Sequence, residues 1–166
     1  YEDYEKRYRN GELLTADSIH VADSLRFVTP RGKVVYGGGG IIPDIFVPKD
    51  TSIENETLLF VSRSGFMNHF IFEFLEKNRS WYKGLTFQDF LSDYVVEDSL
   101  ALEFIDYARL NEARIDLSTH SEALKKALKA NIGEQLFGPS ALEFILNQDD
   151  PMILKVLELD SLEGDK

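Results

Sequence analysis

The spacing of apolar residues changes near residue 50 of this chain. Before that point, the apolar runs 25–28 and 34–36 flank a short segment that contains a proline and a glycine. Proline presets the first turn position and glycine tolerates the left-handed one, so this pattern predicts a β-hairpin. A short polar helix is expected before it, up to about Leu14. The strip 41–48, broken by two prolines, is expected to cross the core surface or to pair at a sheet edge.

From about Asn55 onward the apolar residues recur at helical spacing. A helix is expected over 100–110, and two short helices are expected over 140–147 and 151–159. The tail 160–166 is expected to be frayed. The clearest apolar stripe has the spacing i, i+3, i+4, i+7 and i+8, which is typical of a helix packed on a partner surface. Its members are Met67, Phe70, Ile71, Phe74 and Leu75.

Several polar residues carry helix-capping signals. Thr86 with Asp89 resembles a capping arrangement, and Thr119 with Glu122 matches a capping box. The acidic pair 149–150 precedes a proline, and we interpret it as a helix cap and not as a set of metal ligands. Each signal therefore predicts where a helix begins.

These patterns predict an α+β fold that is predominantly α-helical. An N-terminal β-hairpin and extended strip are followed by a helical domain. The expected boundary lies near residue 50, with the end of a larger core over 1–50 and the helical domain over 51–166.

The amino-acid composition narrows the classes of function that this chain can have. The chain has 166 residues, of which 43% are hydrophobic, so it can bury one ordinary core or part of a larger one. The net charge of -11 repels phosphate backbones and anionic lipid, which argues against nucleic acid as a partner. No apolar stretch is long enough to span a bilayer, and we expect this chain to be soluble. Cysteine is absent, which excludes disulfides and thiolate chemistry. Because the chain opens on Tyr1 without an initiator methionine, we expect a piece of a longer protein.

Glycines and histidines provide the first candidates for chemistry. The run Gly37–Gly40 could cradle a phosphate, but no Lys-Ser or Lys-Thr follows and no helix is expected after it, so a strand connection is favoured. His69 and Glu73 share a helix face, and His20 lies between Asp17 and Asp23, so each group offers two potential metal ligands. His120 stands alone. We expect satisfied or surface histidines, and neither a metal nor a cofactor is predicted.

A more specific motif lies between the hairpin and the proline strip. It consists of a Thr-Pro-x-Gly turn, a short strand, glycines, and an apolar residue before Pro-Asp. The matching residues are Thr29, Pro30, Gly32, Gly37, Gly40, Pro43 and Asp44. This segment resembles the post-catalytic strip of carboxyl-terminal processing peptidases, also called tail-specific proteases. The resemblance covers about residues 25–48, and the chain has more glycine before Pro-Asp than the commonest form of the family.

The resemblance implies a serine endopeptidase of the bacterial periplasm or cell envelope, in which a lysine activates the serine. Both dyad residues and the peptide-docking domain would lie upstream of this chain, so no catalytic residue is assigned here. Lys33 occupies a turn position and does not match the family's Phe-Gly-Lys-Gly-like motif. The implied partners are the remainder of the parent protease and, through upstream domains, protein substrates. Because the hairpin lacks its sheet, residues 1–48 are expected to pack less well than the helices.

Two readings from other classes remain open. Surplus apolar helix faces are typical of interfaces, so the residues from about Asn55 onward could form a module for self-association or protein–protein interaction. The aromatic stripe at 70–74 could instead line a ligand groove of an independent binding domain, although core packing is the commoner role of such a stripe.

Overall fold

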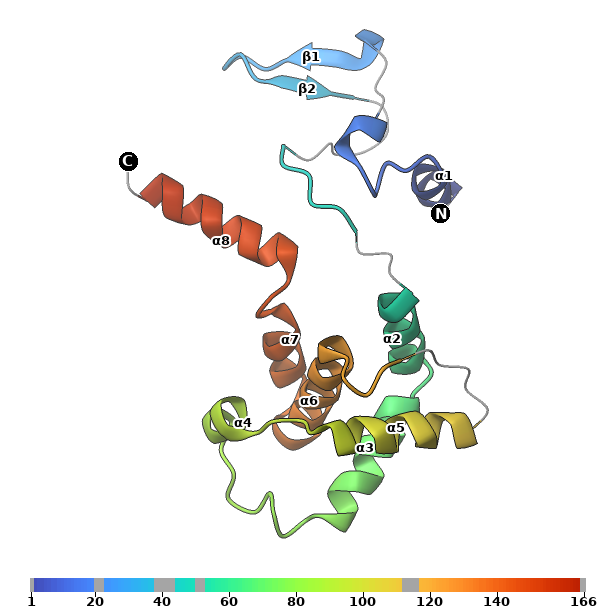
Figure 1. Ribbon diagram of the computed structural model, residues 1–166. Helices are drawn as coiled ribbons and strands as arrows, with labels where there is room; N and C mark the ends of the chain where they lie inside the picture. Colours follow the sequence, from blue (N-terminus) through green and yellow to red (C-terminus); the bar gives the residue numbers. More distant parts are fainter. Residues whose placement is uncertain (1, 20–22, 38–43, 50–52, 112–116, 165–166) are drawn as a thin grey trace. The chain divides into compact units, whose positions relative to one another are not determined.

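The computed structural model describes residues 2–19, 23–37, 44–49, 53–111 and 117–164. The chain divides into two compact units, Tyr1–Asp50 and Thr51–Lys166. It is an α+β protein and predominantly helical, as the residue patterns predict. Figure 1 shows that the described strands belong to the N-terminal unit and form a single hairpin.

The N-terminal unit is built around this hairpin. Its elements are α1 (Glu2–Arg9), η1 (Ala16–Ser18), η2 (Asp23–Leu25), β1 (Arg26–Val28) and β2 (Val34–Tyr36). The strands pair antiparallel with Phe27 opposite Val35, which confirms the predicted hairpin. Residues 44–49 form no strand, and Lys49 N donates to Leu13 O at 3.0 Å. Edge pairing is therefore not found in the described part of the strip, while residues 41–43 lie outside the described ranges.

Burial differs sharply between the two units. None of the N-terminal side chains whose burial is described is buried, and Phe27 and Val28 of β1 are both exposed. Every buried residue of the core lies between Val61 and Ile145. The looser packing expected for residues 1–48 is therefore confirmed for their described part.

The described part of the C-terminal unit consists of helices and the segments that connect them. They are α2 (Ile53–Arg63), α3 (Phe66–Lys77), α4 (Phe87–Asp93), α5 (Asp98–Leu110), α6 (Glu122–Phe137), α7 (Pro139–Asn147) and α8 (Pro151–Gly164). The predicted helices over 100–110 and 140–147 correspond to α5 and α7. The expectation of a frayed tail from residue 160 is wrong, because α8 continues to Gly164. No helix breaker precedes that glycine, and the polar residues of the last turns keep the helical conformation.

The core forms around α6, which packs against α2, α3, α4, α5 and α7. Leu124, Leu128 and Ile132 of α6 are fully buried. The apolar stripe of α3 meets this surface as predicted, with Phe74 only partly buried. At Gly133 an added Cβ would lie 3.0 Å from Ile145 Cδ1 of α7, so the absence of a side chain permits this close helix contact.

Two lysines of α6 bind the carboxyl ends of neighbouring helices. Lys126 Nζ donates to Leu146 O of α7 at 2.8 Å, and Lys129 Nζ donates to Leu91 O in the last turn of α4 at 2.9 Å. Unpaired carbonyls and the helix dipole make such ends favourable for cations. Burial lowers the pKa of both lysines. These contacts explain how a helix packed on several sides can carry lysines close to its core.

The helix starts were predicted with mixed success. Thr86 caps α4 by accepting a hydrogen bond from Asp89 N at 3.2 Å, which confirms that prediction. The cap predicted at Thr119 is wrong, because Ser121 caps α6 by accepting from Leu124 N at 2.9 Å. The backbone before Ser121 forms a turn, in which Ser121 N donates to Ser118 O, so the helix begins only after it.

Helix α5 provides a matched test of the core. Ile105 is 1% exposed, whereas Leu102 on the same helix is 47% exposed. Ile105→Ala should lower the free energy of unfolding by about 2–5 kcal/mol, because it removes buried methyl groups and leaves a cavity. Leu102→Ala should change it by only about 0.5 kcal/mol. Urea unfolding followed by circular dichroism measures both, and similar losses for the two variants would contradict this account of the core.

Candidate functional site

The hairpin turn carries the first group of predicted site residues. Thr29 N donates to Lys33 O at 2.8 Å, and Gly32 N donates to Thr29 O at 2.8 Å. The Thr29 hydroxyl also accepts from Lys33 N at 3.0 Å. Gly32 has φ +80°, a left-handed conformation that L side chains rarely adopt. Pro30 lies at the exposed tip. The threonine, proline and glycine of the motif therefore each have a role in closing the turn.

The structure links this turn to the aspartate of the Pro-Asp pair. Lys33 Nζ lies 2.6 Å from Asp44 Oδ2, eleven residues further along the chain. Gly37 ends the second strand by donating from its N to Leu25 O at 2.8 Å. A Cβ at Gly37 would lie 3.0 Å from the Phe27 ring, so a larger residue would disturb the hairpin there. Gly40 and Pro43 lie outside the described residues, as does most of the glycine run considered for phosphate binding.

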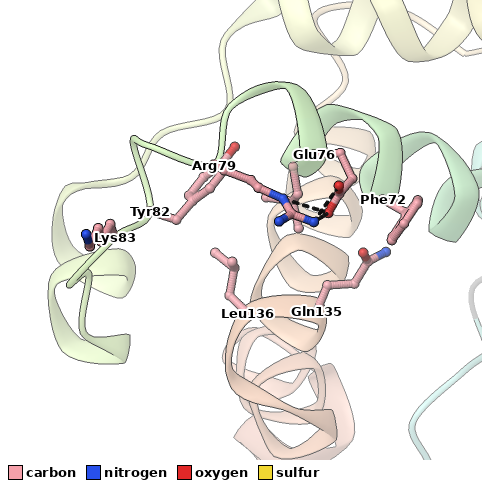
Figure 2. Close-up of a pocket in the computed structure, with 8 residues that line it drawn as sticks. Phe72, Glu76, Arg79, Tyr82, Lys83, Gln135 and Leu136 are labelled. Carbon is pink, nitrogen blue, oxygen red and sulfur yellow. Dashed lines mark hydrogen bonds and ion pairs between the residues drawn. The ribbon is translucent and has the colours of Figure 1, made fainter.

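A second candidate site is an open cleft of about 470 Å³ in the helical unit. Side chains from α3 and the loop after it form one side, and side chains from α6 form the other (Figure 2). Its lining residues are Phe72, Leu75, Glu76, Arg79, Tyr82, Lys83, Gln135 and Leu136. Gln135 Nε2 donates to Asn68 O at 2.8 Å and ties the two sides together. The volume lies in the range of small-molecule pockets, but the cleft is open to solvent.

The charges of the cleft are only partly balanced. Arg79 and Glu76 face each other in Figure 2, and both Arg79 Nη2 contacts to the carboxylate are 2.6 Å or shorter. Lys83, also in the lining, makes no ion pair with any described residue. The Tyr82 hydroxyl is buried and has no hydrogen-bond partner among the described residues. Burial, together with the nearby Tyr94, raises the pKa of Tyr82, so its hydroxyl stays protonated near neutral pH. The cleft thus provides apolar surface, one ion pair and one unpaired cation.

Helix α8 is a third notable feature. Met152, Val156 and Leu157 are each about 60% exposed, and Leu154 and Leu162 are exposed as well. Asp150 Oδ1 accepts from Met152 N at 2.8 Å and Ile153 N at 3.0 Å, so the predicted cap at the acidic pair is confirmed for this residue. A helix that is apolar around most of its circumference normally packs against other surfaces. On α8 much of this apolar area faces solvent.

The histidines do not form a metal centre in the described part of the chain. His69 Nε2 lies 3.3 Å from Glu73 Oε1 as the i, i+4 spacing predicts, but no third ligand joins them, and no group of three potential ligands occurs among the described residues. His120 Nδ1 lies 2.8 Å from Asp98 Oδ2, and Lys125 Nζ lies 2.7 Å from Asp98 Oδ1. This cluster joins the starts of α5 and α6. His20 lies outside the described residues.

Part of the helical unit resembles a known protein family. Residues 58–138 are similar to a family of unknown function, DUF8443. The matched segment is just under half of the chain; it begins within α2 and ends after α6, so it contains the whole lining of the cleft. No curated protein and no solved structure matches the chain. Within the described residues, none of the helices has the length and apolar character required to cross a bilayer.

Sequence reasoning missed both the cleft and the exposed face of α8. The cleft combines residues near 80 with residues near 135, and no local pattern links them. The signal for α8 was present in the sequence, because apolar residues occupy nearly every position of 152–157. Such a run does not fit a helix with one apolar stripe, and it could have indicated a helix with more than one contact surface.

The contacts of Asp98 with His120 and Lys125 indicate that the stability of the protein depends on pH. The hydrogen bond from Lys125 is the main cause that lowers the pKa of Asp98. The resulting stabilisation is present above the usual aspartate pKa of about 4 and is lost as the pH falls through the lower value of the folded protein. Asp98→Asn should therefore lower the melting temperature at pH 7 and have progressively less effect below pH of about 4. Asp93→Asn, at an exposed carboxylate, is the control, and an Asp98→Asn effect that is independent of pH would contradict the assignment.

Proposed function

We propose that this chain is the carboxyl-terminal part of a bacterial envelope serine endopeptidase resembling carboxyl-terminal processing peptidases. In this proposal the N-terminal unit supplies scaffold to the protease core, and the catalytic serine and lysine lie upstream. The observation that carries the proposal is the closed Thr-Pro-x-Gly turn, whose Lys33 holds Asp44 of the Pro-Asp pair at 2.6 Å. The residue that follows the turn thus contacts the aspartate of the Pro-Asp pair.

The exposed apolar side chains of the hairpin support a role as part of a larger sheet. Phe27, Val28, Val35 and Tyr36 are all exposed, although they are residue types that strands normally bury. An isolated two-stranded hairpin is marginally stable in water, and further strands or a packed helix normally complete it. The missing protease core would supply such a surface.

The surroundings of Lys33 support a scaffold role for this chain. A lysine that acts as a general base must be desolvated, because burial favours its neutral form. Lys33 is instead exposed and paired with a carboxylate. It therefore serves the geometry of the strip and does not replace the upstream lysine of the dyad.

Two measurements test this proposal. Peptide mapping of the natural full-length polypeptide by mass spectrometry should place a serine motif and a Phe-Gly-Lys-Gly-like motif before Tyr1. The 166-residue chain alone should not cleave unfolded protein substrates. A natural chain that begins near Tyr1, or serine-dependent cleavage by this chain alone, would contradict the proposal.

A second candidate function is self-association through the helical unit, and it is compatible with the first. The observation that favours it is the exposed apolar surface of α8, where Val156 and Leu157 are 63% and 59% exposed. Contiguous apolar patches of this kind are typical of interaction sites on soluble proteins.

Light scattering at several protein concentrations tests the association. The unmodified chain should form a dimer as its concentration rises, and Leu157→Glu should keep it monomeric because a carboxylate would have to be desolvated in the interface. Leu102→Glu, the same change at an exposed leucine of α5, should leave the dimer intact. A chain that stays monomeric at all concentrations would exclude this second function.

A further inference from the structure

One face of α8 combines apolar residues with a single carboxylate. Ile153, Val156, Leu157 and Asp160 follow the spacing i, i+3, i+4 and i+7, so they share one side of the helix. All four are exposed. Asp160 makes no ion pair with any described residue. The other charges in the middle of the helix satisfy each other, because Lys155 Nζ lies 2.7 Å from Glu158 Oε2. The negative charge that remains available therefore lies on the apolar face.

The cleft between α3 and α6 carries the opposite charge, also beside apolar side chains. Phe72 of its lining is 55% exposed, and Tyr82 and Leu136 add further apolar surface. Arg79 is neutralised by Glu76, whereas Lys83 makes no ion pair with any described residue. Each surface thus carries one unpaired charge beside apolar side chains, and the two charges are of opposite sign.

We infer that α8 of one copy of this chain docks on the α3–α6 cleft of a second copy, with Asp160 beside Lys83. The inference rests on the self-association proposed above and names the two surfaces that meet. Val156 and Leu157 are the apolar anchors against Phe72, Tyr82 and Leu136. A helix projects only a few side chains into a cleft of about 470 Å³. A few central side chains usually supply most of the binding free energy of an interface.

The occupant of the cleft is a second copy of the chain because two copies can each dock α8 on the cleft of the other. Every copy carries both surfaces, so two copies that exchange α8 use both clefts and both helices. The resulting pair has two-fold symmetry and leaves neither surface exposed. A one-way contact between the same surfaces would instead continue into an open chain of subunits. The expected product is therefore a closed dimer.

The absence of cysteine makes a direct test possible in the full 166-residue chain. A Lys83→Cys chain with one tag is mixed with an Asp160→Cys chain with another tag in the presence of a short bifunctional thiol-reactive cross-linker. A cross-link between the two tagged chains is expected, because a lysine–aspartate pair holds the two backbones farther apart than a disulfide spans but within reach of such a linker. The matched control replaces Asp160→Cys by Lys155→Cys on the other side of α8, which should not form this cross-link. Equal cross-linking from both positions, or none from Asp160→Cys, would overturn the inference.

The double variant Lys83→Cys, Asp160→Cys separates exchange between copies from closure within one copy. Exchange gives a covalent dimer on non-reducing electrophoresis. A covalently closed monomer would overturn the inference, because α8 would then reach its own cleft.

Reversing the charges at positions 83 and 160 provides an independent test of the contact. Lys83→Glu should raise the dimer dissociation constant about fivefold or more, since a surface ion pair worth up to about 1 kcal/mol is replaced by repulsion at each of two equivalent contacts. Adding Asp160→Lys should restore the original value. If Lys83→Glu has no effect, or if Asp160→Lys does not restore dimerisation, the α8–cleft contact is wrong while association itself still stands. If the unmodified chain is monomeric throughout, the proposed self-association fails together with this inference.

Discussion

The packing of α6 against its neighbours is the constraint on which the helical unit depends. Leu124, Leu128 and Ile132 are fully buried, and Gly133 allows the close approach of α7. Two further positions of α6 also make contacts, because Lys126 and Lys129 bind the carboxyl ends of α7 and α4. Helix α6 therefore buries apolar side chains and also binds carbonyl groups at the carboxyl ends of two neighbouring helices. The cleft depends on it as well, since Gln135 and Leu136 form one of its sides.

Local patterns in the sequence were sufficient for much of this fold. The stripe on α3 and the buried residues Phe104, Ile105 and Ala108 of α5 follow helical spacing, and this spacing identifies the face that each helix buries. The hairpin was also predictable, because Pro30 and Gly32 fit the turn that joins two short apolar strands. In each case the information lies within a few neighbouring residues. The fold class follows from the sum of these local preferences.

Features that depend on contacts between distant residues could not be predicted in this way. Both Thr119 and Ser121 are good capping residues, and only the turn closed on Ser118 selects the second. Helices α4, α5 and most of α6 separate Lys83 from Leu136 along the sequence, so no local pattern predicts that both residues line the same cleft. The length of α8 was underestimated because polar residues near its end were interpreted as a frayed tail, although the helix continues to Gly164. The part that Lys126 plays at the end of α7 was likewise invisible in the sequence.

The junction between α7 and α8 has a consequence for any partner that α8 meets. Lys126 binds Leu146 O and also pairs with Asp149, while Asp150 holds the first backbone N–H groups of α8. These contacts tie the segment before α8 to α6 and cap the first turn of α8. A segment that is already ordered loses less conformational entropy when it binds. The ordered start of α8 would thus let a small apolar face bind more tightly than its area alone suggests.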